Sequence, residues 1–82
     1  AASNFVKAFG RRVKALREER DLSQEVLADR AGLHRTAISL IETAKRASIL
    51  DTVEKLARAL GVPPADLMPP LDGPPKRSGR RP

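Results

Sequence analysis

The stretch LSQEVLADRAGLHRTAISLIE, residues 22–42, decides the fold, because it reads as two short helices joined by a tight turn. The hydroxyl of Ser23 can accept a hydrogen bond from the unpaired N–H groups at the start of the first helix. Gly32 can adopt the left-handed backbone conformation that ends this helix without steric cost. Apolar residues at helical spacing mark the inner side of the second helix: Ala37, Ile38 and Ile41.

Two helices at a steep angle across a glycine turn form a helix-turn-helix unit, whose second helix can enter the major groove of DNA. The stretch resembles the lambda-repressor-like, Cro/C1-type (xenobiotic-response-element) regulators, and the resemblance extends from about Phe9 to Leu67. The matching residues are Leu22-Ser23-Gln24-Glu25, Leu27-Ala28, Ala31-Gly32, Ile38-Ser39 and Ile41-Glu42. The resemblance implies an all-α, five-helix domain that binds double-stranded DNA as a transcription regulator. In its most specific form it implies a repressor that acts as a homodimer on a palindromic operator.

Apolar periodicity predicts further helices on both sides of this unit. Over residues 4–20, a stripe that would close the core is formed by Phe5, Phe9, Val13 and Leu16. After the unit, Ser48 can cap a helix that Gly61 ends, and the apolar face of this helix is Leu50, Val53, Leu56, Ala57 and Leu60. A short last helix over residues 65–68 is expected after Pro64, and it would seal the core with Leu67 and Val62.

The length and charge of the chain bound its organisation. Eighty-two residues allow one small domain, which we expect over residues 1–68. Residues 69–82, PPLDGPPKRSGRRP, hold few apolar side chains, and we expect them to be a disordered basic tail. This tail is either a linker or a segment that adds salt-sensitive affinity for DNA. The net charge of +6 favours polyanionic partners, although a solvated surface would give the same total.

Several function classes find no support in the residues. Cysteine is absent from this chain, which excludes disulfides and a cysteine-based zinc site. No apolar run approaches the roughly 18 residues that span a membrane, and we expect a cytoplasmic protein without a membrane partner. The single histidine has no evident catalytic or metal-ligating partner, and no phosphate-binding loop is present. We therefore expect no enzyme, no metal and no cofactor.

The second helix of the unit, residues 35–43, is expected to read base edges in the major groove. Arg35 is the strongest candidate reader, because its forked guanidinium can bond both acceptors of a guanine. Thr36, Ser39 and Leu40 face the same way at helical spacing. The alternative is that all four are ordinary exposed helix residues.

Gln24 opens the first helix of the unit, and the resemblance implies that its side chain contacts a phosphate and helps to position the second helix. His34 stands where this family usually has a Ser or Thr cap, and a histidine is a poorer cap. Further phosphate contacts are expected from side chains near the same surface: Arg11, His34, Thr43, Lys45 and Arg46.

The resemblance also implies a partly buried ion pair between Arg17 and Glu42, which would tie the first helix of the chain to the recognition helix. The alternative is two exposed charges that contribute little to stability. Family members usually have glycine at the place of Ala44, where the chain leaves the recognition helix with a positive φ. With alanine at this place, the turn is either strained by about 1 kcal/mol or different in shape.

No motif marks a dimer surface. The resemblance places it around residues 50–68, where exposed apolar side chains would be its sign, with Ile49, Leu67 and Met68 as candidates. A different class of function is an interaction module, an antitoxin or adaptor whose helix-turn-helix fold mainly binds a protein partner. The basic recognition helix argues against a purely protein-binding role.

Overall fold

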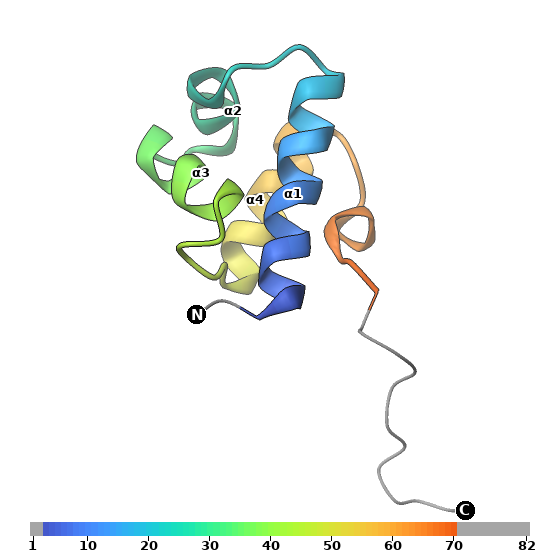
Figure 1. Cartoon of the computed structure of the whole chain (residues 1–82). Helices are drawn as coiled ribbons and strands as arrows, with labels where there is room; N and C mark the ends of the chain where they lie inside the picture. The colour runs from blue at the N-terminus through green and yellow to red at the C-terminus, as the bar shows by residue number, and fades with distance from the viewer. Residues whose placement is uncertain (1–2, 71–82) are drawn as a thin grey trace, which may run out of the picture.

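The computed structural model describes residues 3–70, which form four α-helices, one 3-10 helix and no strand (Figure 1). The elements are α1 (Asn4–Glu19), α2 (Gln24–Ala31), α3 (Arg35–Glu42), α4 (Leu50–Leu60) and the 3-10 helix η1 (Pro64–Leu67). The all-α class is confirmed. The expected fifth α-helix is instead a single 3-10 turn, and it starts at Pro64, one residue before the predicted range.

The helices surround one core. In Figure 1, α2 and α3 lie on one side of α1 and η1 lies on the other, while α4 lies behind α1 and contacts α1, α2 and η1. Every element contributes at least one side chain to the set that is almost completely buried: Val13, Leu27, Ile38, Ile41, Leu56 and Leu67. The predicted role of Leu67 in sealing the core is confirmed, and Val62 packs against the same cluster.

Three helix boundaries follow from the residues that were expected to set them. The hydroxyl of Ser23 accepts a hydrogen bond from the N–H of Val26 at 3.1 Å and caps α2. Gly32 ends α2 with a φ of 69°, and Gly61 ends α4 with a φ of 72°. These left-handed residues close each helix without the steric cost that a Cβ would bring.

The start of α4 differs from the prediction. Ile49 and not Ser48 is the N-cap residue, and no side chain caps the helix. The hydroxyl oxygen of Ser48 is instead buried, and it has no hydrogen-bond partner among residues 3–70. The helix therefore begins one residue later than a serine cap would require, because the chain is still extended at residue 49.

Several large apolar side chains lie at the surface, including two that were expected on inner faces, Phe5 and Leu50. Leu50 is 84% exposed, and Phe5 and Val26 are also exposed. Leu50 and Phe5 stand in the first turns of α4 and α1. Val26 lies on the outer side of α2, whose inner side is Leu27, Ala28 and Ala31.

The predicted tail lies outside the described residues, apart from Pro69 and Pro70, and the boundary at residue 68 stays a prediction. Within residues 3–70, no helix has the length and apolar character needed to cross a lipid bilayer.

Two arginines at α1 bind backbone carbonyls of other elements. Arg20 donates to the carbonyl oxygen of Leu60 at 2.7 Å, and Arg12 donates to that of Asp66 at 2.8 Å.

Gly10 lies where α1 approaches the end of α3 most closely, and no sequence pattern had singled it out. A Cβ atom at this position would overlap the carbonyl oxygen of Ile41 and lie 3.1 Å from that of Glu42. Both obstacles are backbone atoms, which cannot rotate away as a side chain could. The missing side chain therefore allows α1 to pack directly on the backbone of α3.

We predict that Gly10→Ala lowers the free energy of unfolding by about 1–3 kcal/mol, because the added methyl group forces the two helices apart. In an uncrowded helix the same change would stabilise by about 1 kcal/mol. Urea denaturation of both proteins measures the difference. The exposed Ala15 of α1 provides the control for helix propensity, since Ala15→Gly should cost about 1 kcal/mol. A Gly10→Ala protein more stable than wild type would contradict the prediction.

Candidate nucleic-acid interface

The helix α3 has two distinct sides. Ile38 and Ile41 point into the core and are almost completely buried. On the opposite side, Arg35 and Thr36 are exposed, and Ser39 and Leu40 are half-buried. The four predicted base-contacting residues therefore lie together on the outer side of one helix, and Arg35 and Thr36 stand in its first turn.

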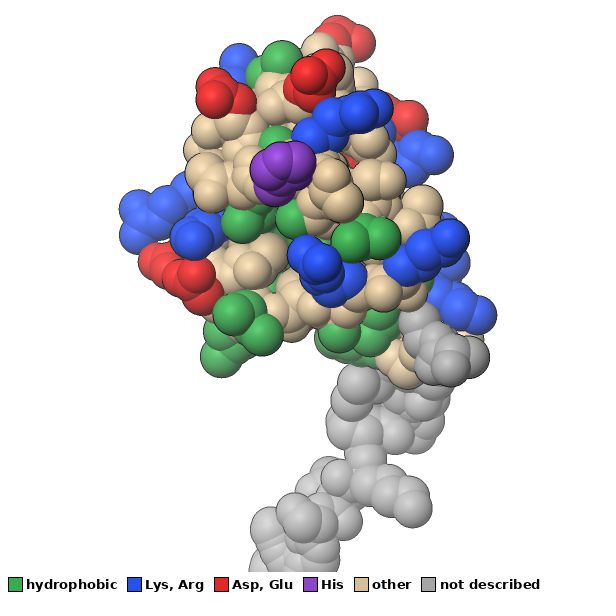
Figure 2. Space-filling model, turned by 90° about the vertical axis from the view of Figure 1, so that its left-hand side faces the viewer, with side chains coloured by type: hydrophobic (Ala, Val, Ile, Leu, Met, Phe, Trp, Pro, Cys, Tyr) green, Lys and Arg blue, Asp and Glu red, His purple; other side chains and the backbone are tan. Residues whose placement is uncertain are grey.

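His34 caps α3. Its Nδ1 atom accepts a hydrogen bond from the N–H of Thr36 at 3.3 Å. A neutral imidazole that accepts at Nδ1 carries its proton on Nε2, and Nε2 is then a donor. Figure 2 looks onto the α2–α3 side of the domain, where the histidine (purple) lies near the centre with Lys and Arg side chains on either side. The ring can thus cap the helix with one nitrogen and donate to a phosphate with the other.

Four basic side chains predicted as DNA contacts are exposed: Arg11, Arg35, Lys45 and Arg46. Among residues 3–70, none of the four makes a hydrogen bond or ion pair. The neighbouring Arg12 differs, because its guanidinium is occupied by the carbonyl of Asp66. The four charges are therefore available to an external acceptor.

Thr43 is less available than its position suggests. Its hydroxyl donates to the carbonyl oxygen of Ser39 at 2.7 Å, within the last turn of α3. The N–H of Thr43 donates to the same carbonyl at 3.1 Å. A phosphate contact from Thr43 would require the hydroxyl to leave this carbonyl.

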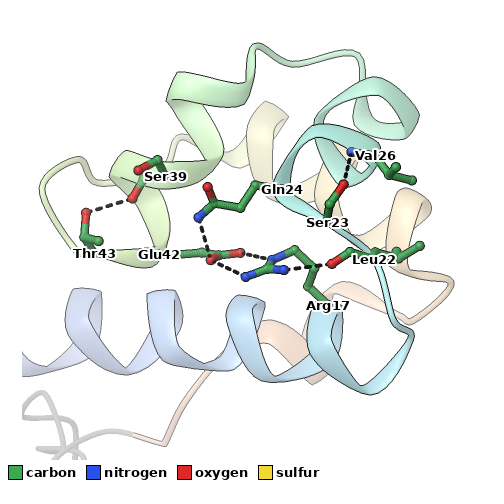
Figure 3. Close-up of polar contacts among 8 residues, drawn as sticks. All are labelled: Arg17, Leu22, Ser23, Gln24, Val26, Ser39, Glu42 and Thr43. Atoms are coloured by element: carbon green, nitrogen blue, oxygen red, sulfur yellow. Dashed lines mark hydrogen bonds and ion pairs between the residues drawn. The ribbon is translucent and has the colours of Figure 1, made fainter.

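Arg17 and Glu42 form the ion pair that the resemblance implied (Figure 3). The guanidinium donates from Nε to Glu42 Oε2 at 2.7 Å and from Nη2 to Oε1 at 3.0 Å. Its Nη1 atom donates to the carbonyl oxygen of Leu22 at 2.7 Å. The hydrogen bonds to Glu42 raise the pKa of Arg17 above its ordinary value, so the guanidinium stays charged. The pair joins α1 to the last residue of α3 and to the segment before α2.

Gln24 makes a contact that the sequence did not reveal. Its Nε2 atom donates to Glu42 Oε1 at 3.1 Å, so the first residue of α2 also binds the end of α3. Figure 3 shows the three side chains of Arg17, Glu42 and Gln24 pointing toward one another in the space between α1, α2 and α3. The side chain predicted to contact a phosphate is thus already held by a carboxylate.

The exit from α3 contains a strained residue. Ala44 has a φ of 60°, in the region that favours glycine, so the strained alternative is correct and the turn keeps its shape. The next two N–H groups, of Lys45 and Arg46, both donate to the carbonyl of Leu40, at 2.8 and 3.2 Å. These bonds fix the start of the loop that carries two predicted phosphate contacts.

The chain is similar to proteins that control transcription. Residues 8–69 match the model of a helix-turn-helix domain family. The chain is 45% identical over 67 residues to the control protein C.BamHI of Bacillus amyloliquefaciens, and the match covers 80% of this chain and 83% of that protein. It is 40% identical over 60 residues to the cryptic phage CTXphi transcriptional repressor RstR of Vibrio cholerae, with 73% of this chain and 54% of the repressor covered.

A solved structure shares the fold. It is that of the restriction-modification controller protein C.Esp1396I, determined as a tetramer in complex with its natural 35 base-pair operator. The TM-score is 0.75 at 29% identity, with 79% of this chain and 86% of that chain covered.

We predict that Ala44→Gly raises the free energy of unfolding by about 1 kcal/mol, because glycine removes the steric cost of the left-handed conformation. For a domain of this size the midpoint of thermal unfolding should rise by roughly 4–8 °C. Ala47→Gly is a matched control in the same loop, since Ala47 is not among the residues with positive φ. It should leave stability unchanged or lower it. Equal effects of the two substitutions would show that residue 44 is not strained.

Proposed function

This chain belongs to the helix-turn-helix domain family, and we propose that it is a sequence-specific, double-stranded DNA-binding transcription regulator of the Cro/C1 type. In the finer form of the proposal, it is a repressor that acts as a dimer on a palindromic operator through α3. The proposed activity is binding and not catalysis, since the relatives are named as a control protein and a repressor. Such a regulator would act in the cytoplasm.

The two-sided character of α3 carries the proposal. The buried Ile38 and Ile41 fix the helix to the core, while the exposed Arg35 and Thr36 face outward from its first turn. In helix-turn-helix proteins the N-terminal residues of the recognition helix contact base edges in the major groove. Arg35 has no partner among residues 3–70, so its guanidinium can bond O6 and N7 of a guanine without breaking an internal contact.

Contacts to the DNA backbone would surround this reading helix. The Nε2 atom of His34 lies at the start of α3, and Lys45 and Arg46 follow its end. Arg11, exposed on α1, adds a further positive charge. Such contacts to phosphates fix the register of the protein and carry no sequence information.

An apolar patch supports the dimer. Its members are exposed residues at the first turns of α1 and α4 and at the end of η1: Phe5, Leu50 and Met68. Ile49, a predicted candidate for the dimer surface, is also exposed but lines a different hollow. Phe5, Leu50 and Met68 also line a hollow of about 200 Å³. Figure 2 shows hydrophobic side chains along the lower edge of the α2–α3 side. Leu67, one of the candidates for this surface, is instead fully buried in the core.

A second copy of the chain is the partner that this patch fits. A two-fold axis through an edge of the DNA-binding side would place both copies of α3 on the same side of the dimer. Dimeric helix-turn-helix proteins bind half-sites that are about 34 Å apart, one turn of the duplex. The assembled state of C.Esp1396I on its operator supports self-association of related chains. An antitoxin or adaptor function has no comparable support, since the relatives reported above are regulators.

We predict that Arg35→Ala relaxes sequence preference at the base pair that Arg35 reads. The difference in binding free energy between the preferred base and a wrong base should fall by about 1–3 kcal/mol. Selection of bound duplexes from random DNA, followed by competition binding at two salt concentrations, measures the effect. The control is Lys45→Ala, which should weaken binding to all duplexes alike and reduce the slope of log K against log salt by about 1. The prediction is wrong if each protein, wild type and Arg35→Ala, binds all duplexes with the same affinity. In that case α3 does not read bases.

We also predict that Leu50→Asp makes the protein monomeric, because it places a charge in the centre of the apolar patch. The fold should survive, since Leu50 is 84% exposed. Sedimentation equilibrium measures the oligomeric state, and circular dichroism checks the fold. Val26→Asp, at an exposed apolar residue of α2 outside the patch, should leave the dimer intact. A Leu50→Asp protein that dimerises like wild type would place the interface elsewhere.

A further inference from the structure

Glu42 lies at the point where α1, α2 and α3 meet, and only 2% of its side chain is exposed. Its Oε2 atom accepts one hydrogen bond from Arg17, and its Oε1 atom accepts one from Arg17 and one from Gln24. The two bonds from the guanidinium already compensate the buried charge. The bond from Gln24 adds a third donor to the same carboxylate.

The carboxylate fixes the orientation of the Gln24 side chain. A carboxamide has an oxygen that accepts and a nitrogen that carries two N–H donors. Because an ionised carboxylate can only accept, the nitrogen and not the oxygen of Gln24 must face Glu42. One N–H is used in this bond at 3.1 Å, and the second N–H of the same nitrogen remains.

This orientation matters for a phosphate, which also can only accept. A freely rotating glutamine would present its oxygen to the phosphate in half of its orientations, and these would repel. Gln24 is half-buried at the first position of α2, and Figure 3 shows its carboxamide directed toward the end of α3. Glu42 would also repel a phosphate, but the guanidinium of Arg17 neutralises its charge.

We propose that Glu42 is a positioning residue for DNA binding, and that it holds the Gln24 carboxamide so that one N–H is directed to a backbone phosphate. This inference rests on the proposed function. Arg17 fixes Glu42, Glu42 fixes Gln24, and Glu42 is also the last residue of α3. The contact to the backbone and the recognition helix are thereby held in one register.

A double-mutant cycle on the full chain tests the proposal, with binding measured to a selected operator and to a random duplex. Gln24→Ala should weaken binding to both duplexes about tenfold, the loss of one hydrogen bond to a charged group. Glu42→Gln should weaken binding about fivefold more in the wild-type background than in the Gln24→Ala background, where only the loss of the contact to Arg17 remains. Additive effects of the two substitutions would overturn the proposal.

Glu54→Gln is the matched control for charge. Glu54 is an exposed residue of α4 whose one ion pair among residues 3–70 is with Arg58, so its replacement removes the same negative charge without touching the contacts of Gln24. It should leave DNA binding unchanged or strengthen it slightly, independently of Gln24. A loss with Glu54→Gln equal to that with Glu42→Gln would show that the effect is not one of positioning.

A measurement on the wild-type protein covers the case in which Glu42→Gln does not fold. The two side-chain N–H protons of Gln24 give separate signals in ¹H–¹⁵N spectra. One should be shifted downfield in the free protein, and the other should move when the operator is added. If both protons resonate as in a free glutamine, or if neither moves on DNA binding, the proposal fails.

Separate results would exclude the positioning role of Glu42 and the proposed regulation of transcription. If Gln24→Ala leaves affinity unchanged while Arg35→Ala still alters sequence preference, the positioning role is wrong and the proposed function stands. If the wild-type protein does not distinguish duplexes at all, the proposed function itself is wrong.

Discussion

The structure depends on the ion pair between Arg17 and Glu42, because it is the polar contact at which three helices meet. Both charges are largely withdrawn from water, with 11% of the Arg17 side chain and 2% of the Glu42 side chain exposed. Removing one partner of such a pair costs about 3–5 kcal/mol, since it leaves an uncompensated buried charge. Small domains are stable by only about 5–15 kcal/mol, so replacing either residue alone would remove a large part of the stability of this domain.

The pair also explains how a helix of eight residues can serve as a reading element. A helix this short has little stability of its own and depends on packing and on its ends. The imidazole of His34 closes its start, the carboxylate of Glu42 anchors its end, and Ile38 and Ile41 hold its inner side. The exposed Arg35 and Thr36, which are proposed to contact bases, then have no packing role in the core and could vary without loss of the fold.

Much of this architecture could be predicted from the sequence, and the limits have physical reasons. Periodicity and caps located α2 and α3, because Ser23 and Gly32 act through local backbone geometry. Periodicity assigned Leu50 to an inner face, but in the first turn of α4 this side chain is 84% exposed, and a spacing rule carries no information on where the packing partners lie. The pairing of Arg17 with Glu42 came from family resemblance alone. The bond from Gln24 to Glu42 and the contact at Gly10 depend on distances between distant segments, which no local pattern encodes.

The close approach at Gly10 has a consequence for the thermodynamics of DNA binding. Backbone atoms of α1 and α3 meet there, and a change of side-chain rotamer cannot alter their separation. A recognition helix held in this way docks as a rigid body. We expect the contribution of α3 to the heat-capacity change of complex formation to come from the surfaces that meet, without the additional term that folding on binding contributes. A residue without a side chain thus sets the calorimetric signature of the complex.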